Sequence, residues 1–462
     1  MTISGKTCTI REKTEKEASM LFKRKIYQSL KKWKDESQGK SALLIEGPRR
    51  VGKSTIVEEF AKSEYQSYIL IDFSTCAPDI RALFEDLSDL NYIFLQLQLQ
   101  YHVQLHTRQS LIIFDEVQLC PLARQAIKSL VKDHRYDYIE TGSLISIKKN
   151  VQHILIPSEE HRIYMYPMDY EEFLWAQGDE VTVPLLKQLF TAQKAAGEGA
   201  HRKLMRYFRL YMLVGGMPQA VATYLESNNF EQVDRQKREI IELYEDDFRK
   251  IDSTGRLSLL FDAIPAQLAK NYNRYHVSNI LPSARPADVL TDIAELKDSR
   301  TVLVSYHVND PGPDMAATRD LTRFKLFLAD TGLFTTLAFK DKDFTENDIY
   351  KKLLSDKLPA NLGYLYENIV AQTLAAKGDQ LYYTTFHYGE TKNAYEIDFL
   401  LARQNKICPI EVKSSGYRSH ASLDVFCNKY SQFLLAPYVV YTKDLQKEEN
   451  LTYLPMYMAQ FL

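Results

Sequence analysis

Eight consecutive residues, from Gly47 to Ser54, have the clearest chemical pattern in the sequence: Gly-Pro-Arg-Arg-Val-Gly-Lys-Ser. They fit G-x-x-x-x-G-K-[ST], follow the apolar run Leu43–Ile45 and open a helix-like segment, which is the context that a phosphate-binding loop requires. Glycines at the first and sixth positions let successive N–H groups turn inward around a phosphate. We expect the Lys53 ammonium to reach the outer phosphates of a nucleotide and the Ser54 hydroxyl to bind Mg²⁺. The predicted nucleotide-binding residues are Gly47, Pro48, Arg49, Arg50, Val51, Gly52, Lys53, Ser54 and Thr55.

Two acids, Asp115 and Glu116, follow a second apolar run, Leu111–Phe114. Such a run is typical of a buried parallel strand, and acids at its carboxyl end lie where ligands bind in open α/β sheets. We expect Asp115 to complete the Mg²⁺ shell and Glu116 to act as the general base on the attacking water. Taken alone, the pair would be interpreted as a polar cap. Its position after the phosphate loop, with one strand between them, favours the catalytic interpretation.

Two further positions are candidates for contact with a nucleotide. A third predicted strand ends in Ile139–Ser143, and either Ser143 or Thr141 could contact the γ-phosphate or the water. A simple turn at the strand end explains these residues equally well. Arg162, just before the run Ile163–Tyr166, is either an arginine that acts in trans or a surface charge.

A second constellation of polar residues lies near the C-terminus, on two predicted strands at 395–402 and 407–412. Side chains alternate along a strand, so acids two residues apart share a face while the apolar residues between them enter the core. If the strands pair, two acids and a lysine converge, and a helical glutamate upstream completes a site for Mg²⁺ or Mn²⁺. The lysine would then help to deprotonate a water for attack on a phosphodiester. A solvated strand face is an equally good explanation. The candidate residues are Glu367, Asp398, Glu411 and Lys413.

The elements that must position these residues change character along the chain. Short apolar runs alternate with helix-like segments after residue 40, which predicts an α/β fold: a parallel sheet with helices on both faces. The expected strands of this sheet are Ser41–Glu46, Ser67–Phe73, Ser110–Phe114, Tyr136–Glu140 and Arg162–Tyr166. Apolar residues at helical spacing predict an amphipathic helix over 17–35. We interpret it as packing on the next domain rather than as a nucleic-acid-binding arm.

The chain is expected to divide into four parts. Residues 1–40 form the N-terminal helical segment and 41–178 the phosphate-loop domain. Residues 179–345 are predicted to be an α-rich domain with a winged-helix-like end near the strand Val302–Val308. Residues 346–462 are predicted to be a C-terminal α/β domain.

Composition limits the class of protein. The formal net charge is −2, from 58 Lys and Arg against 60 Asp and Glu, which excludes a histone-like polycation. No apolar run approaches the roughly 18 residues that a bilayer span requires, so no membrane partner is expected. The five cysteines are scattered, as is typical of the reduced thiols of a cytoplasmic protein.

The chain resembles the bacterial and archaeal AAA-type ATPases whose C-terminal part is a nuclease-like domain of unknown function. The matching words are EGPRRVGKST, LIIFDEVQ, ETGSL, HRIYMYPMDYEEF, YMLVGGMPQAV, IPAQLAKNY, FKLFLADTGLF, LGYLYENIV, EIDFLL and PIEVKSS, in the family's order from about residue 41 to 415. The resemblance implies binding and hydrolysis of ATP by Lys53, Ser54, Asp115 and Glu116, with Ser143 similar to the family's sensing residue. It also implies a restriction-endonuclease-like site at the C-terminus. Where family members often have glycine before the arginine, this chain has His161, which weakens a role for Arg162.

Two functions are consistent with these sites. In the first, a Mg²⁺-dependent ATPase is coupled to a nuclease-like domain that holds a second divalent metal and acts on DNA. In the second, the protein is a slow nucleotide-sensing regulator or scaffold whose C-terminal domain docks a partner protein without cleaving nucleic acid. The sequence leaves the oligomeric state open.

Overall fold

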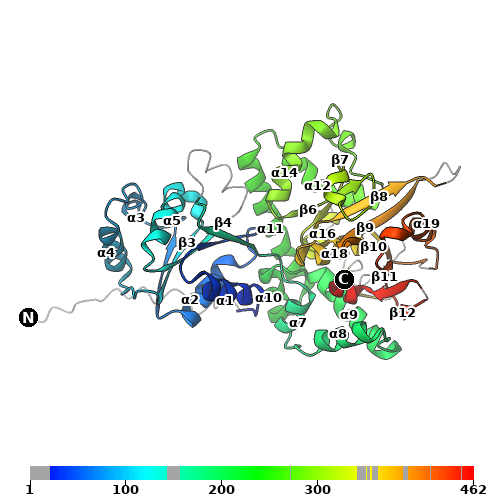
Figure 1. The fold of residues 1–462 in the computed structure, drawn as a ribbon, viewed down its shortest axis with the longest axis horizontal. Coiled ribbons are helices and arrows are strands. Elements are labelled where there is room, and N and C mark those ends of the chain that lie inside the picture. Colours follow the sequence, from blue (N-terminus) through cyan, green and yellow to red (C-terminus); the bar gives the residue numbers. More distant parts are fainter. Residues whose placement is uncertain are drawn as a thin grey trace, which may run out of the picture.

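The computed structural model describes residues 21–142, 157–270, 272–340, 350, 354–355, 363–388, 394–416, 418–448 and 450–462. Figure 1 shows two bodies side by side, a smaller one drawn in blue to cyan and a larger one drawn in green to red. We call them the N-terminal body (α1 to β5) and the C-terminal body (α7 to η6). Within the described ranges, no helix combines the length and apolarity that crossing a membrane requires.

The N-terminal body is built on a five-stranded sheet in the order β2-β3-β4-β1-β5. Every neighbouring pair of strands is parallel, which confirms the predicted α/β class of this part. The strands are β1 (Ala42–Glu46), β2 (Ser67–Asp72), β3 (Ser110–Asp115), β4 (Asp137–Gly142) and β5 (Glu160–Tyr164).

Helices cover both faces of this sheet because its central strands are apolar on both sides. Along β3, Ile112 and Phe114 enter one core while Leu111 and Ile113 enter the other. The helical elements are α1 (Ile26–Ser37), α2 (Lys53–Glu64), α3 (Pro78–Ala82), α4 (Leu90–Tyr101), η1 (Val117–Leu119) and α5 (Pro121–Asp133).

The first helix differs from its prediction. Helix α1 begins at Ile26, whereas the periodicity predicted a helix over 17–35, of which residues 17–20 lie outside the described part. Residues 21–24 are not helical, because Arg24 is held by partners far along the chain, which are described below. The helix packs on the sheet through Leu30 and Trp33, which are buried beside the β1 residues Leu43 and Ile45.

The C-terminal body combines many helices with an eight-stranded mixed sheet in the order β12-β13-β11-β10-β9-β8-β6-β7. Its strands are β6 (Val302–Val308), β7 (Arg319–Leu328), β8 (Tyr382–Phe386), β9 (Tyr395–Arg403), β10 (Lys406–Lys413), β11 (Tyr438–Tyr441), β12 (Gln446–Lys447) and β13 (Thr452–Pro455). Its helical elements are α7 (Tyr170–Ala176), α8 (Thr182–Ala192), α9 (Glu198–Val214), α10 (Pro218–Ser227), α11 (Phe230–Ile251), α12 (Arg256–Asp262), α13 (Ile264–Ala269), η2 (Val277–Asn279), η3 (Pro286–Val289), α14 (Leu290–Asp298), α15 (Met315–Thr318), α16 (Thr331–Ala338), α18 (Gly363–Ala376), α19 (Ala421–Lys429), η5 (Ser431–Phe433) and η6 (Met456–Phe461).

This sheet crosses the boundary predicted between residues 345 and 346. Strand β6 pairs antiparallel with β7 and parallel with β8, so strands from both sides of that boundary share one sheet. One continuous apolar core runs from Met168 to Ala459. The β6–β7 pair is therefore the edge of a large sheet and not the wing of a separate helical domain.

Three glycines, Gly215, Gly216 and Gly332, allow the end of α9 to pack closely against the start of α16. A Cβ atom on Gly216 would lie 2.1 Å from the Met168 oxygen, and one on Gly332 would lie 2.5 Å from the Gly215 Cα atom. The buried Asp330 carboxylate accepts the N–H groups of Gly216, at 2.5 Å, and of Leu333, at 2.8 Å. Any side chain at these positions must displace backbone.

Replacement of Gly216 by alanine should therefore be costly. We expect Gly216→Ala to lower the free energy of unfolding by about 1–3 kcal/mol, because packed backbone must shift to admit the methyl group. Thermal or urea unfolding measures this. The matched control is Gly199→Ala, where no atom lies within 4 Å of the added Cβ and the helix α9 should gain about 0.5–1 kcal/mol. Equal stability of the two variants would contradict the close packing.

Candidate nucleotide site

The phosphate loop connects the end of β1 to the start of α2. Its backbone enters the left-handed region at Gly52, with φ +96°, and at Arg50, with φ +67°. Gly52 is the N-cap of α2 and no side chain caps this helix, so the N–H groups of its first turn are left for a ligand. A Cβ atom on Gly47 would lie 2.4 Å from the Met165 oxygen, so glycine is required there too.

Lys53 lies folded back across the loop. Its Nζ atom donates to the oxygens of Gly47, at 2.9 Å, and Pro48, at 3.0 Å, and its side chain is buried. Burial lowers the pKa of Lys53 to about 8, although the carboxylates of Glu116 and Asp115 favour the charged form. Among the described residues the ammonium therefore has neutral carbonyl partners and no carboxylate at hydrogen-bonding distance, which suits its transfer to a phosphate oxygen.

Asp115 joins the loop to the central strands. Its Oδ1 atom accepts a hydrogen bond from the Ser54 hydroxyl at 2.7 Å and a short one from the Thr141 hydroxyl. The register explains the second contact, because Phe114 pairs with Glu140 and the next residues face each other at the carboxyl edge of the sheet. Hydroxyl and carboxylate oxygens are the ligands that Mg²⁺ prefers, so Ser54 and Asp115 fit that ion.

Glu116 lies beside Asp115 and Thr141. It adopts a left-handed backbone conformation, with φ +53°, and its N–H donates to Thr141 Oγ1 at 3.4 Å. Its carboxylate accepts a short hydrogen bond from the amide of Gln118, a contact that the sequence pattern did not indicate. Thr141, one of two alternatives at the end of β4, is thus part of the site. The other, Ser143, lies outside the described residues.

Arg162 is not brought to the phosphate loop. It lies in β5 opposite Leu44 of β1, before the carboxyl end of the sheet. Its Nε atom donates to Glu160 Oε1 at 2.7 Å, and the buried Glu160 carboxylate also binds the buried Arg124. Within the described part of the chain, Arg162 serves an ion-pair network of the sheet, and a role in trans stays a prediction.

Arg24 contacts the loop from outside and was missed by the sequence analysis. Its guanidinium donates to the Val51 oxygen at 3.0 Å and to the Tyr166 oxygen at 2.6 Å. Its Nε atom lies 3.2 Å from the carboxylate of Glu172 on α7, and both side chains are buried. No local pattern could have identified it, since Val51 is 27 residues away and Tyr166 is 142.

The C-terminal candidates also converge. Asp398 Oδ2 accepts the Val412 N–H at 2.7 Å, and the Lys413 ammonium lies 2.7 Å from Glu411 Oε1. Burial is the main reason that the pKa of Asp398 lies well above its usual range, and the neighbouring carboxylate of Glu367 raises it further. The structure thus brings together the four residues that the sequence singled out.

An unpredicted lysine occupies this cluster. Lys325 of β7 is buried, with its Nζ atom 2.9 Å from Glu367 Oε1 and 2.6 Å from Glu396 Oε1. Burial alone would lower the pKa of Lys325, but the two carboxylates outweigh it and raise the pKa well above the usual value. Among the described residues, no three His, Cys, Asp or Glu side chains are arranged to hold a metal ion. The second divalent-metal site is therefore not supported, and the ammonium groups of Lys325 and Lys413 already pair with three of the acids.

Family models match three parts of the chain. A model described as an AAA domain matches residues 39–174. Two models described as domains of unknown function, DUF8612 and DUF4143, match residues 205–343 and 362–458. None of the curated proteins matches the chain. The N-terminal body has the parallel α/β fold of a P-loop domain and matches the AAA-domain model, and the nuclease likeness of the C-terminal part stays a prediction.

Solved structures resemble the chain only distantly. The Walker-type ATPase PABY2304 of Pyrococcus abyssi has 15% identity and a TM-score of 0.40, with 69% of this chain and 96% of that chain covered. The Orc1 protein of Aeropyrum pernix in complex with DNA has 12% identity and a TM-score of 0.28, with 72% and 95% covered. A STAND-type signal transduction ATPase of Pyrococcus horikoshii has 11% identity and a TM-score of 0.26, with 75% and 48% covered.

The buried pair of Arg24 and Glu172 should be sensitive to loss of one partner. We expect Arg24→Gln to destabilise the protein by about 3–5 kcal/mol, because Glu172 is left as an unpaired buried charge. It should also weaken binding of ATP at least tenfold, since the Val51 carbonyl loses its donor. Thermal unfolding and calorimetric titration measure the two effects.

The neighbouring Lys23 supplies the control. Lys23 pairs with Glu180 at 2.8 Å on the surface, and Lys23→Gln should cost less than about 1 kcal/mol and leave ATP affinity unchanged. Adding Glu172→Gln to Arg24→Gln should recover part of the lost stability. Unchanged ATP affinity in a folded Arg24→Gln variant would show that Arg24 does not position the loop.

Proposed function

We propose that the protein is a Mg²⁺-dependent ATPase. The observation that carries this proposal is the contact of the Ser54 hydroxyl with Asp115 at 2.7 Å, beside an uncapped helix N-terminus and the buried Lys53. In this function the loop N–H groups and Lys53 bind the phosphates. Ser54 and Asp115 hold the ion, which when bound offsets the charge of the phosphates.

Glu116 is proposed to act as the general base toward the attacking water. Its backbone is fixed through Thr141 and its carboxylate through Gln118, so the carboxylate has one defined position beside the loop. A base gains most from being held within hydrogen-bonding reach of the proton it removes. Thr141 links this base to Asp115, and it is the described candidate for the sensing position.

The contacts of the loop with α11 support a coupling between nucleotide and C-terminal body. The Arg49 side chain lies 3.2 Å from Asp247, and its carbonyl accepts the Tyr244 hydroxyl at 3.1 Å. Helix α11 lies at the junction of the two bodies (Figure 1). A change in loop position on hydrolysis would therefore act directly on this helix.

Substitutions should separate binding from turnover. Lys53→Ala removes a charge-assisted hydrogen bond of about 1.5–3 kcal/mol, so the Kd for ATP should rise roughly ten- to hundredfold. Glu116→Gln should bind ATP normally and lose turnover by about 10²–10⁴, the usual contribution of a general base. Phosphate release and calorimetric titration measure these effects.

Lys62→Ala is the matched control for Lys53, because Lys62 lies on the same helix α2 and forms only a surface pair with Glu58. It should leave both binding and turnover unchanged. Wild-type turnover in Lys53→Ala or Glu116→Gln would refute the proposed site.

For the C-terminal cluster, the proposal of a DNA-cleaving site competes with docking of a partner without cleavage. Cleavage rests on the convergence of Asp398, Glu411 and Lys413. The burial of Lys325 between Glu367 and Glu396 favours docking, because the resident ammonium pairs with Glu367, one of the acids that a catalytic metal would need.

We therefore expect the wild-type protein to leave plasmid and single-stranded DNA intact with Mg²⁺ or Mn²⁺, with and without ATP. Gel analysis of full-length protein, with ATP turnover recorded in the same samples, tests this. Glu411→Ala and Lys413→Ala are run in parallel. Cleavage by the wild type that both variants lose would contradict the docking function and establish an ATP-coupled nuclease.

A further inference from the structure

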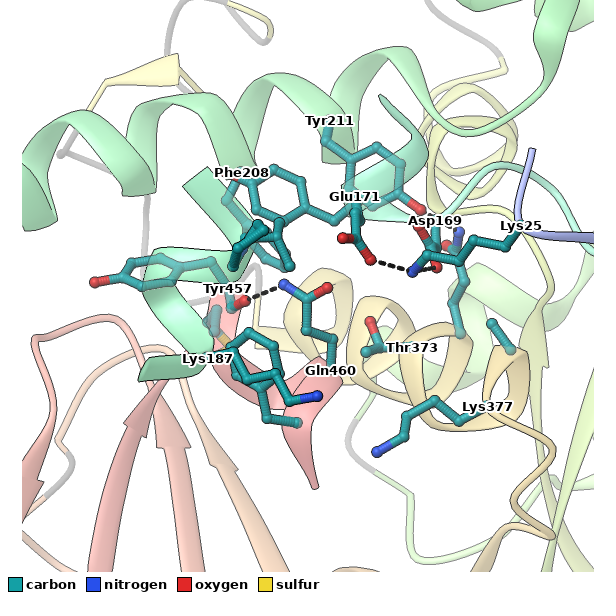
Figure 2. A pocket seen from close by; sticks show the side chains of 17 residues that line it. Lys25, Asp169, Glu171, Lys187, Phe208, Tyr211, Thr373, Lys377, Tyr457 and Gln460 are labelled. Carbon is teal, nitrogen blue, oxygen red and sulfur yellow. Dashed lines mark hydrogen bonds and ion pairs between the residues drawn. The ribbon is translucent and has the colours of Figure 1, made fainter. Parts of the chain in front are cut away.

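A cavity of about 420 Å³ lies in the C-terminal body, and neither the phosphate-loop residues nor the C-terminal acids line it. Helices α7, α8, α9 and α18, the C-terminal turn η6 and the residue Lys25 surround it (Figure 2). Its volume falls in the range of small-molecule sites, which are concave and mostly apolar with few polar groups.

The inner wall of this cavity is apolar. Val183 of α8, Phe208 and Tyr211 of α9, and Met456 and Phe461 of η6 contribute to it. Polar and charged side chains line the rest of the cavity, and in Figure 2 Thr373 and Gln460 point into the space between these walls. A ligand with a flat or compact apolar part would replace water against the aromatic rings.

The charges around the cavity do not balance. Lys25 is neutralised, with its Nζ atom 2.5 Å from Asp169 and 2.6 Å from Glu171. Lys187 and Lys377 also line the cavity, and neither ammonium has a hydrogen-bond or ion-pair partner among the described residues. In the view of Figure 2 their side chains lie on the same side of the cavity and extend towards each other.

Lys377 in particular lacks compensation. The acid that acts on it is Asp379, but the two oxygens of that carboxylate are already bound by Arg403, at 2.6 and 2.7 Å. The side chain of Lys377 is exposed but partly desolvated by its neighbours, which lowers its pKa, and the positive charges of Arg403 and Lys25 lower it further. An anion beside Lys377 would offset the positive charges of Arg403 and Lys25.

We infer that this cavity binds a small organic anion, with its carboxylate, sulfonate or phosphate group between Lys187 and Lys377 and its apolar part against Phe208 and Tyr211. The anionic group of the ligand would contact the two lysines, and its apolar part would contact the two aromatic side chains. The apolar part gains from leaving water, and the anion supplies the charge that the two ammonium groups lack. A cation or a neutral polar molecule gains neither advantage.

The test uses full-length protein and the probe 8-anilino-1-naphthalenesulfonate, which combines a sulfonate with an aromatic body. Fluorescence titration gives its Kd for the wild type and for the double variant Lys187→Gln/Lys377→Gln. We expect the Kd to rise at least tenfold in the variant. The uncharged analogue N-phenyl-1-naphthylamine should change its Kd less than twofold, because it lacks the sulfonate. Both lysines are exposed, so folding should be preserved.

Two further variants locate the probe. Lys203→Gln removes another exposed lysine of α9 that does not line the cavity, and it should leave the Kd unchanged. Thr373→Trp places a bulky ring inside the cavity and should abolish binding. The inference is wrong if the double variant keeps the wild-type Kd, if the neutral analogue weakens equally, or if Thr373→Trp still binds the probe.

Discussion

A phosphate loop turns its N–H groups inward, so its carbonyl groups face outward into protein and each needs a donor. In this chain four of the loop carbonyls accept a hydrogen bond from a side chain, while that of Gly52 accepts the Ile56 N–H within α2. Lys53 serves the oxygens of Gly47 and Pro48, Tyr244 serves that of Arg49, and Arg24 serves that of Val51. The phosphate loop thus depends on residues of α2, of α11 and of the segment before α1. Its shape is a property of both bodies together.

Two buried lysines show how partners decide what a charge can do. Lys53 has only carbonyl oxygens at hydrogen-bonding distance, and burial lowers its pKa, so it is poorly satisfied until an anion arrives. Lys325 has two carboxylates, and its pKa is raised. The first environment suits binding of a phosphate. The second already holds a cation between its acids, so a metal ion would have to displace the Lys325 ammonium, and convergence of acids alone does not make a metal site.

The parallel sheet was predicted correctly from sequence because its signal, the alternation of apolar runs and helix-like segments, is local. The phosphate loop and the acids after β3 are also local patterns, each beside an apolar strand, and the structure brings Ser54 and Asp115 into contact. The parts that were missed depend on distant partners. Arg24 and Lys325 look like ordinary surface charges, since the partners of Lys325 are 42 and 71 residues away. The pairing of β6 with β8 is equally non-local, and so a boundary was predicted inside a sheet.

The residues that a family model matches need not include every residue on which the structure of that part depends. The AAA match begins at residue 39 and ends at 174, yet Arg24 lies before its start and Tyr244 far beyond its end. A polypeptide cut to that match would keep every motif residue of the nucleotide site. It would lose α1, which covers one core of the sheet, and would leave Glu172 and the Val51 carbonyl unpaired. The recognisable module is thus smaller than the set of residues that holds it together, since its loop and one face of its sheet are completed by flanking sequence.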